Sequence, residues 1–353
     1  MLKILPYLKL AVEKNASDIF FTNNAPAMLK IEGEMLAVGK TLMSNSLIRE
    51  LVENILTPEQ IQYLEQHLEI DLATDAGGLG RFRVNVFTQR NSTAMVLRYV
   101  KAEIPTIEKL GVPEVLKDLV MLKRGMILMV GATGSGKSTT LAAMMNHRND
   151  NAAGHILTIE DPIEYIHPNK RSIINQREVG TDTESYARAL KSSLREAPDM
   201  ILIGEVRVRE TMDAVIQLAN TGHLAISTLH ANNAYQALQR IVNLYPDELR
   251  AQLYMDLSMT LRAIVSQRLV RRKDGRRCAA MEVMINTPYI AELILTRKIE
   301  DVKEAMASSS DRGMLTFDMS LYKLYKDGII DLDEALNNAD SRTNLEAKIN
   351  FGM

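Results

Sequence analysis

A glycine-rich run in the middle of the chain is the residue pattern best suited to chemistry. Residues 131–138 read Gly-Ala-Thr-Gly-Ser-Gly-Lys-Ser, which matches the phosphate-binding loop (P-loop) pattern in full. An apolar segment, Gly125–Val130, precedes the run and a helical pattern, Thr139–His147, follows it, as the motif requires. Glycines let backbone N–H groups turn toward phosphate oxygens, and the start of a helix favours negative charge. The residues expected to bind nucleotide here are Gly131, Thr133, Gly134, Ser135, Gly136, Lys137, Ser138 and Thr139.

The end of this loop indicates the ligand. We expect Lys137 to pair with the β and γ phosphates and Ser138 to bind a magnesium ion, so the expected cofactors are ATP and Mg²⁺. The alternative is a glycine-rich turn that binds nothing, which the complete motif in its required context disfavours.

An acidic residue follows a second apolar segment. Met200–Ile203 ends in Gly204-Glu205, and a glutamate at the tip of such a strand can orient and polarise an attacking water. We expect Glu205 to be catalytic. The alternative is a surface acid that caps the helix after it.

Three carboxylates lie close together after a third apolar segment. In Thr158-Ile-Glu160-Asp161-Pro162-Ile-Glu164, the proline favours an extended or turned backbone, so the acids are presented on a loop. We expect Glu160 to be catalytic and Asp161 and Glu164 to act on the cofactor, through Mg²⁺ or its water. The alternative is a solvated turn.

Two histidines flank the apolar segment Leu224–Leu229. His230 follows the segment, at the carboxyl end where α/β sheets bind ligands, and we expect it to act in catalysis. His223 precedes the segment, so direct contact with a ligand is less favoured, although it remains a nucleotide-binding candidate. The alternative for each is a structural histidine.

The elements that must position these side chains are continuous apolar strands alternating with helices. Continuous apolar strands predict a parallel sheet covered by helices on both faces. The expected strands are Met126–Val130, Ile156–Ile159, Met200–Ile203 and Leu224–Thr228.

The first hundred residues have a different pattern, which predicts a small α+β domain. Helical patterns begin at Leu5 and occupy residues 45–68, with a helix start at Thr57. In one expected strand, Gly80–Thr88, apolar residues alternate with Arg81, Arg83 and Asn85, as in a half-buried strand. The other expected strands are Asp18–Thr22, Ala27–Ile31, Glu34–Val38 and Thr93–Val100.

The predicted organisation has four parts. Residues 1–100 form the N-terminal domain, 101–113 a linker with two prolines and a glycine, 114–288 the P-loop domain, and 289–353 a helical C-terminal region. A basic run around Asp274-Gly275 is interpreted as a charged hairpin, because no aromatic residues interleave with it as in a nucleic-acid site.

Composition bounds the class of protein. The 353 residues carry a formal charge of −2, which disfavours a nucleic-acid coat. One cysteine, Cys278, rules out an internal disulfide and a multi-cysteine zinc site, and we expect it to be structural. No apolar stretch approaches the roughly 20 residues of a membrane span, so the expected location is cytoplasmic.

The ordered motifs resemble those of the secretion ATPase superfamily. The P-loop, the acidic run at Glu160, Gly204-Glu205-Val-Arg207 and the two histidines are similar to its Walker A, Asp, Walker B and His boxes. Near the N-terminus, Ala16-Ser-Asp18 and Gly80–Asn85 resemble the type IV pilus retraction ATPases of the PilT and PilU types.

This resemblance implies a RecA-like P-loop ATPase domain, a PAS-like N-terminal domain, a helical tail and a homo-hexameric ring. It also implies that arginines of the N-terminal domain reach the nucleotide phosphates, where a guanidinium would stabilise transition-state charge. The matching candidates are Arg81, Arg83 and Arg98, with Arg81 and Arg98 taken as catalytic. The alternative is a basic strand face exposed to water.

Departures from the PilT pattern favour the PilU type. Val208 stands where PilT-type proteins carry aspartate, and Ala291 and Leu295 stand where they carry arginines. The resemblance therefore implies an ATP-driven motor that drives or assists pilus retraction in twitching motility. Its implied partners are a ring of a PilT-like paralogue and a pilus platform protein of the inner membrane, with no nucleic acid.

Three other functions remain open from the sequence. A type II secretion or pilus assembly ATPase is disfavoured because the tetracysteine zinc module of those relatives is missing. A largely structural partner of a PilT ring is disfavoured because Lys137, Ser138 and Glu205 are all present. A DNA-translocating motor is the fourth possibility.

Overall fold

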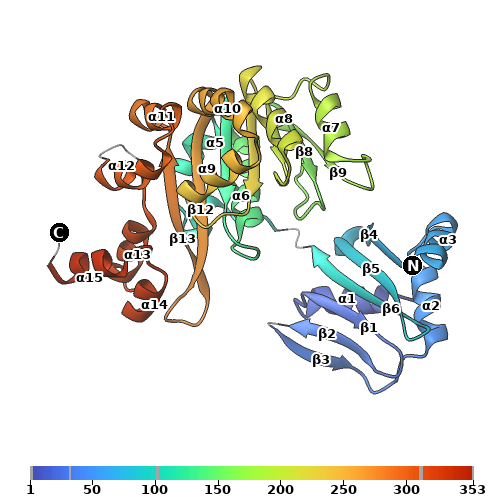
Figure 1. The fold of residues 1–353 in the computed structure, drawn as a ribbon. Coiled ribbons are helices and arrows are strands. Elements are labelled where there is room, and N and C mark those ends of the chain that lie inside the picture. The colour runs from blue at the N-terminus through green and yellow to red at the C-terminus, as the bar shows by residue number, and fades with distance from the viewer. Residues whose placement is uncertain (1–2, 32, 101–102, 310–312, 352–353) are drawn as a thin grey trace. The chain divides into compact units, whose positions relative to one another are not determined.

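The chain forms two compact units. The computed structural model describes residues 3–31, 33–100, 103–309 and 313–351, and divides between Met1–Glu103 and Ile104–Met353 (Figure 1). Of the expected linker, 101–113, residues 101–102 lie outside the described residues, and the residues from Ile104 onward belong to the second unit. Within that segment the short helix α4 (Ile107–Leu110) buries Ile107 in the core of the second unit, because helix α6 (Lys137–Asn151) packs against it.

The first unit is built on a six-stranded antiparallel sheet in the order β3-β2-β1-β6-β5-β4. The strands are β1 (Asp18–Phe21), β2 (Ala27–Ile31), β3 (Glu34–Val38), β4 (Glu69–Asp75), β5 (Arg81–Gln89) and β6 (Ser92–Val100). The helices are α1 (Leu5–Glu13), α2 (Asn45–Glu53) and α3 (Pro58–His67). The predicted helix start at Thr57 is confirmed by a capping box with Gln60. Strand β4 was not predicted, because no position in it is fully buried and its pattern is weak.

Strand β5 has the predicted two faces. Phe82, Val84 and Val86 are at most 1% exposed, whereas Arg81 and Arg83 lie on the opposite face and are partly exposed. This alternation follows from the two-residue repeat of a β-strand.

The second unit is built on a seven-stranded sheet in the order β13-β12-β7-β11-β10-β8-β9, parallel except for the edge strand β13. The strands are β7 (Gly125–Val130), β8 (Gly154–Glu160), β9 (Ser172–Glu178), β10 (Met200–Ile203), β11 (Leu224–Leu229), β12 (Leu261–Arg271) and β13 (Arg277–Ile285). Strand β9 was not predicted, because it is an edge strand with polar residues in its second half. The predicted parallel sheet is confirmed.

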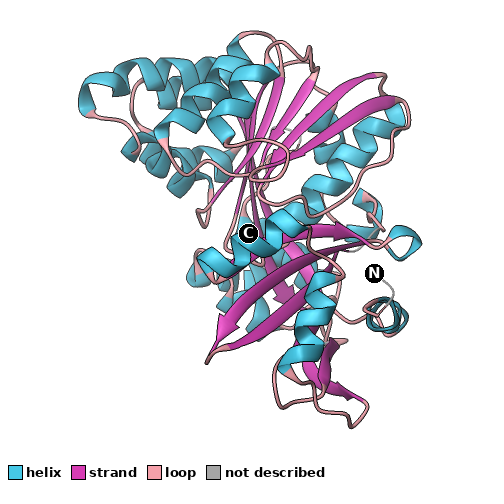
Figure 2. Cartoon of the chain, turned by 90° about the vertical axis from the view of Figure 1, so that its right-hand side faces the viewer, coloured by secondary structure: helices cyan, strands magenta, loops and turns pink. Residues whose placement is uncertain are grey.

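Helices cover both faces of this sheet (Figure 2). Ile127 and Met129 of β7 pack with Leu141 of α6, in a core that also takes residues from α5 (Val115–Val120). Met126 and Leu128 point to the other face, in the core formed with α8 (Arg209–Asn220), α9 (Ala234–Asn243) and α10 (Asp247–Thr260). Because both faces are covered, every residue of β7 is apolar or glycine and buried. Helix α7 (Tyr186–Ser193) also joins this second core, through Ala189.

The C-terminal region is helical, as predicted. Its helices are α11 (Pro288–Leu295), α12 (Val302–Ser308), α13 (Phe317–Lys326), α14 (Leu332–Asn337) and α15 (Arg342–Phe351). The expected hairpin at Asp274-Gly275 joins β12 to β13, and α13 packs on β13. Arg268 of β12 ties this region to the loop after β11: its guanidinium donates to the Asn338 carbonyl at 2.8 Å, to Asp340 Oδ1 at 2.6 Å and to the Asn232 carbonyl at 3.3 Å. In the part of the chain that the structure describes, no helix is long and apolar enough to cross a bilayer.

Candidate functional site

Four parallel strands end at one level and bring the predicted motifs together. Ile159 of β8 lies opposite Ile203 of β10, and Leu229 of β11 lies opposite Val130 of β7. The loops that follow these strands carry the P-loop, the acidic run, Glu205 and His230. Ligands of parallel α/β sheets bind at this carboxyl edge.

A pocket of about 730 Å³ lies at this edge. It is large enough for a small organic ligand. Nine of the predicted site residues line it: Thr133, Gly134, Lys137, Ser138, Glu160, Asp161, Glu164, Glu205 and His230.

The P-loop lysine folds back on its own loop. Lys137 is the first residue of α6, and its Nζ donates to the carbonyls of Gly131 at 2.8 Å and Ala132 at 3.0 Å. Burial lowers the pKa of Lys137, while the charges of Glu205 and Glu164 oppose that shift. An anionic ligand beside this partly buried ammonium group would stabilise its charge in the same way as the two carboxylates do.

Glu205 is held on both of its oxygens. Its Oε1 lies 3.1 Å from His230 Nε2, and its Oε2 accepts from Arg207 Nε and Nη2, each at 2.8 Å. Its side chain is 16% exposed. The carboxylate is therefore fixed in direction at the wall of the pocket, which suits a group that orients a water molecule.

Glu160 is in a drier environment. Its Oε1 accepts from Thr158 Oγ1 at 2.6 Å and from Gln176 Nε2 at 3.3 Å. Burial raises the pKa of Glu160 to about 6, against the effect of these two hydrogen bonds. The pocket therefore contains a carboxyl group that changes charge near neutral pH.

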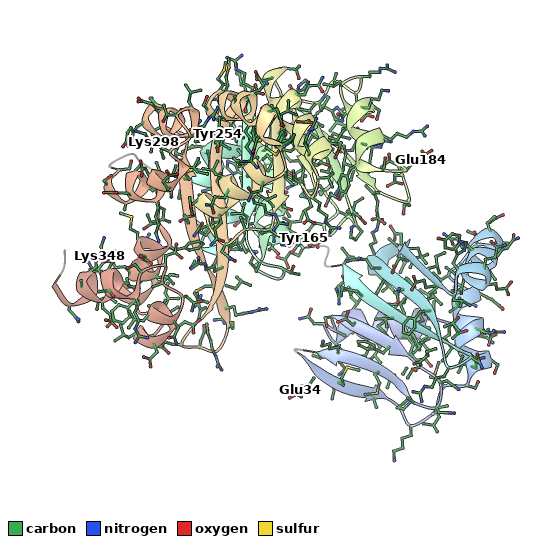
Figure 3. The ribbon with its side chains drawn as sticks, viewed as in Figure 1. Glu34, Tyr165, Glu184, Tyr254, Lys298 and Lys348 are labelled. Atoms are coloured by element: carbon green, nitrogen blue, oxygen red, sulfur yellow. The ribbon has the colours of Figure 1, made fainter. Side chains whose placement is uncertain are left out.

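Some predicted P-loop residues support the pocket without lining it. Thr139 Oγ1 shares a hydrogen bond of 2.8 Å with the hydroxyl of Tyr165, which Figure 3 labels at the edge of the second unit. Ser135 is 7% exposed, and Gly131 and Gly136 form the bends at the two ends of the loop.

His223, the remaining nucleotide-binding candidate, does not line this pocket. Its carbonyl accepts from the N–H of Gly125, the first residue of β7, so His223 lies at the amino end of the sheet. Six residues of strand separate that end from Gly131, which is about 20 Å. The His223 ring contacts Thr221 Oγ1 at 3.0 Å instead, as a structural histidine does.

The three candidate arginines belong to the first unit. Arg83 of β5 lies opposite Arg98 of β6, and Arg98 lies opposite Asp18 of β1. Arg98 Nε donates to Asp18 Oδ1 at 2.8 Å; the Asp18 side chain is 7% exposed and that of Arg98 63%. Arg98 is thus anchored to a buried carboxylate while most of its side chain faces solvent. Arg81 also lies on β5, at the start of the strand.

Comparison with known proteins identifies the family. The model of the family described as "Type II/IV secretion system protein" matches residues 3–320. The chain belongs to this family.

Two curated relatives and one solved structure place the chain within the secretion ATPases. It is 49% identical to the type IV pilus ATPase PilU of Pseudomonas aeruginosa, over 98% of this chain and 91% of that protein. It is 38% identical to the type IV pilus retraction ATPase PilT of the same organism, over 95% of this chain and 98% of PilT. The crystal structure of the pilus retraction motor PilT with bound ADP superposes with a TM-score of 0.92 at 41% identity, covering 98% of this chain and 99% of that one.

These likenesses confirm the resemblance inferred from the motifs and the predicted α/β fold with its N-terminal domain and C-terminal helices. This secretion-family chain is an ATPase and uses a nucleotide.

The site of this secretion ATPase also contains residues that sequence reasoning missed. Tyr165 and Tyr186 line the pocket, and burial with nearby carboxylates raises the pKa of Tyr186 well above its usual range. Tyr165 directly follows Glu164 of the acidic run, so its position was visible in the sequence although its role was not, whereas Tyr186 belongs to none of the predicted motifs. Arg207 stands inside the Glu205 motif, so its position was visible in the sequence although its bond to Glu205 was not.

Proposed function

We propose that this ATPase is an accessory motor of pilus retraction, of the PilU type, which works with a ring of a PilT-type paralogue. The observation that carries the proposal is the 49% identity to a protein named PilU over nearly the whole chain, against 38% to PilT. Val208, Ala291 and Leu295, which depart from the PilT motifs, agree with it.

Nucleotide binding is assigned to the 730 Å³ pocket. The N–H groups of the P-loop, Gly131–Thr139, hold the phosphates, and Lys137 neutralises their charge. Among the described residues no three His, Cys, Asp or Glu side chains are grouped to bind a metal by themselves. This fits Mg²⁺, which prefers phosphate and water oxygens with one or two protein ligands. Ser138 would hold the ion, with Asp161 and Glu164 reached through water.

Hydrolysis is assigned to the carboxylates of the same pocket. Glu205 orients the attacking water and accepts its proton. His230, 3.1 Å from Glu205 Oε1, holds that carboxylate in place. Glu160 lies on the adjacent strand end and assists, as a group that titrates near neutral pH.

The assembly we propose is a cytoplasmic homo-hexamer at the inner-membrane pilus machinery, where the platform protein is its partner. In it, Arg81, Arg83 and Arg98 of the N-terminal domain reach the phosphates and couple hydrolysis to domain movement. The expected parts are the N-terminal domain, which moves, the P-loop domain, which hydrolyses ATP, and the helical C-terminal region from residue 289.

Retraction in living cells tests this function. We would delete the gene and score pilus retraction with and without a PilT paralogue, restoring either the wild-type chain or Glu205→Ala. The expected result is a loss of retraction force despite intact PilT, and no retraction by this chain alone. Full retraction by this chain alone would overturn the accessory assignment.

Cell assays and ATPase measurements together separate the alternatives. If Glu205→Ala restored retraction force fully, the chain would be a structural partner rather than a motor. Loss of pilus assembly or of protein secretion in the deletion strain would indicate an assembly or secretion ATPase. ATP hydrolysis stimulated by added DNA would indicate a DNA motor.

A further inference from the structure

One buried side-chain amide contacts the P-loop from a strand far along the chain. Gln267 lies on β12, next to the residue that pairs with Val130 at the end of β7, and is 3% exposed. Its Nε2 donates to the carbonyl of Ser135 at 2.8 Å, and its Oε1 accepts from Thr140 Oγ1 at 2.7 Å. The amide thus bridges the loop and the first turn of α6, with both of its ends used.

Two glycines of the loop lie very close to Gln267. A Cβ on Gly131 would lie 2.6 Å from the Gln267 carbonyl, and a Cβ on Gly136 would lie 2.8 Å from Gln267 Nε2. Gly136 also has a φ of +87°, which residues other than glycine rarely adopt. The loop can therefore approach Gln267 this closely only because both positions are glycine.

The bond to Ser135 sets the direction of a phosphate-binding group. In a trans peptide the C=O and the N–H point in opposite directions. Holding the Ser135 carbonyl toward Gln267 therefore turns the N–H of Gly136 to the opposite side of the loop. Phosphates bind a P-loop through such outward N–H groups.

We propose that Gln267 is a positioning residue for nucleotide binding, whose amide holds the P-loop in its phosphate-binding shape. Neither a carboxylate nor an ammonium group can replace it, because the site requires a donor toward Ser135 and an acceptor toward Thr140. The proposal rests on nucleotide use by this family and is independent of the role in pilus retraction.

Five variants of the purified full-length chain test the proposal. Gln267→Met removes both polar atoms at similar length, and Gln267→Glu keeps only the acceptor. Thr140→Val removes the hydroxyl and Thr140→Ser keeps it. Gln252→Met on α10 is the matched control, because that exposed amide bonds only to Asp256 in the described structure. For each we would measure the melting temperature, kcat and KM for ATP with Mg²⁺, and the Kd of a fluorescent ADP analogue.

The expected result is a change in binding rather than in turnover. Gln267→Met should raise KM and Kd about tenfold, the loss expected for one to two hydrogen bonds, with kcat changed less than threefold. Gln267→Glu should be at least as severe, since it sets a carboxylate oxygen against the Ser135 carbonyl. Thr140→Val should raise KM and Kd, Thr140→Ser should restore them, and Gln252→Met should match wild type.

Two features of the data distinguish positioning from plain stability. Gln267→Met with Thr140→Val should be no worse than Gln267→Met alone, because both changes break one bridge. Melting temperatures that fall while KM and Kd stay within twofold of wild type would overturn the proposal. If the Gln267 variants do not fold, the comparison of Thr140→Val with Thr140→Ser decides alone: equal Kd values would overturn it.

Discussion

The two glutamates at the pocket differ because their neighbours differ. Glu205 contacts Arg207 and His230, whereas Glu160 accepts from neutral donors: the Thr158 and Gln176 side chains and the backbone of Glu164. Neutral hydrogen bonds do not offset the cost of burying a charge, and the pKa of Glu160 rises to about 6. The Glu160 carboxyl group can therefore change its charge near neutral pH.

This difference predicts the pH dependence of the enzyme. If ionised Glu160 is the active form, kcat/KM for ATP should fall below about pH 6, by about tenfold per pH unit. Glu160→Gln should have lower activity, and its kcat/KM should show no such fall between pH 7 and pH 5. Steady-state kinetics across this range check it, with Glu248→Gln, an exposed site on α10, as the control that keeps the fall in kcat/KM. If the fall in kcat/KM persisted in Glu160→Gln, another group would be responsible for it.

At the scale of elements, strand β13 supports the helix that follows His230. Glu282 of β13 is 4% exposed, and its Oε1 accepts from the N–H of Ala234, the first residue of α9, at 2.7 Å and from Ser266 Oγ at 3.0 Å. Burial raises the pKa of Glu282 to about 7; Asp340 adds to the rise and Arg268 opposes it. The carboxyl group thus fixes the position of α9. At high pH it carries a buried charge, which lowers the stability of the fold.

The sign of the effect on stability follows from this shift. The folded state binds the Glu282 proton more tightly than the unfolded chain does. The contribution of Glu282 to the free energy of unfolding is therefore complete below about pH 4.5 and is lost as the pH rises to about 7. At about 1.4 kcal/mol per pKa unit the loss is of the order of 3 kcal/mol. Glu282→Gln keeps the acceptor oxygen without the charge, so it should raise the melting temperature at pH 8 and change it little at pH 4.5. Glu304→Gln, an exposed site on α12, is the control, and equal shifts at both pH values would contradict the account.

The sequence predicts elements where one local pattern decides them. Three features were predicted from such a pattern: the continuous apolar run of β7, the alternation in β5 and the contiguous P-loop. Strands β4 and β9 were missed, because strands with polar residues look like loops when their partners are unknown. The contacts of Gln267 with Ser135 and Thr140 span more than a hundred residues, and no local spacing reveals them. The same holds for Arg98 and Asp18, which lie 80 residues apart in sequence.

At the scale of the whole molecule, each unit has a core of its own. The core of the first unit includes Phe21, Phe82 and Leu97, and its members among the described residues all belong to that unit. The second unit has separate cores on the two faces of its sheet and a further one around Phe317. Units with separate cores can unfold separately.

We therefore expect two thermal transitions that respond to different changes. ADP with Mg²⁺ at about 100 times Kd should raise the transition of the P-loop unit by several degrees, since such binding adds about 2.7 kcal/mol. Asp18→Ala should lower only the transition of the first unit, because it removes the carboxylate that holds Arg98. Glu13→Ala, at an exposed site, is its control. Differential scanning calorimetry checks both, and a single transition that responds to both changes would show that the units unfold together.

Strand β12 presents consecutive residues to opposite faces of its sheet. Gln267 points to the P-loop, and Arg268 points to the loop after β11 and to the C-terminal region. Deleting a single residue earlier in this strand would bring Arg268 to the position of Gln267 and place a cation beneath the phosphate loop. Inserting a single residue would bring Gln267 to the position of Arg268 and place an amide where Asp340 requires a cation. Length change in this hairpin is therefore tolerable at its tip, beyond Arg271, and nowhere along the strand before it.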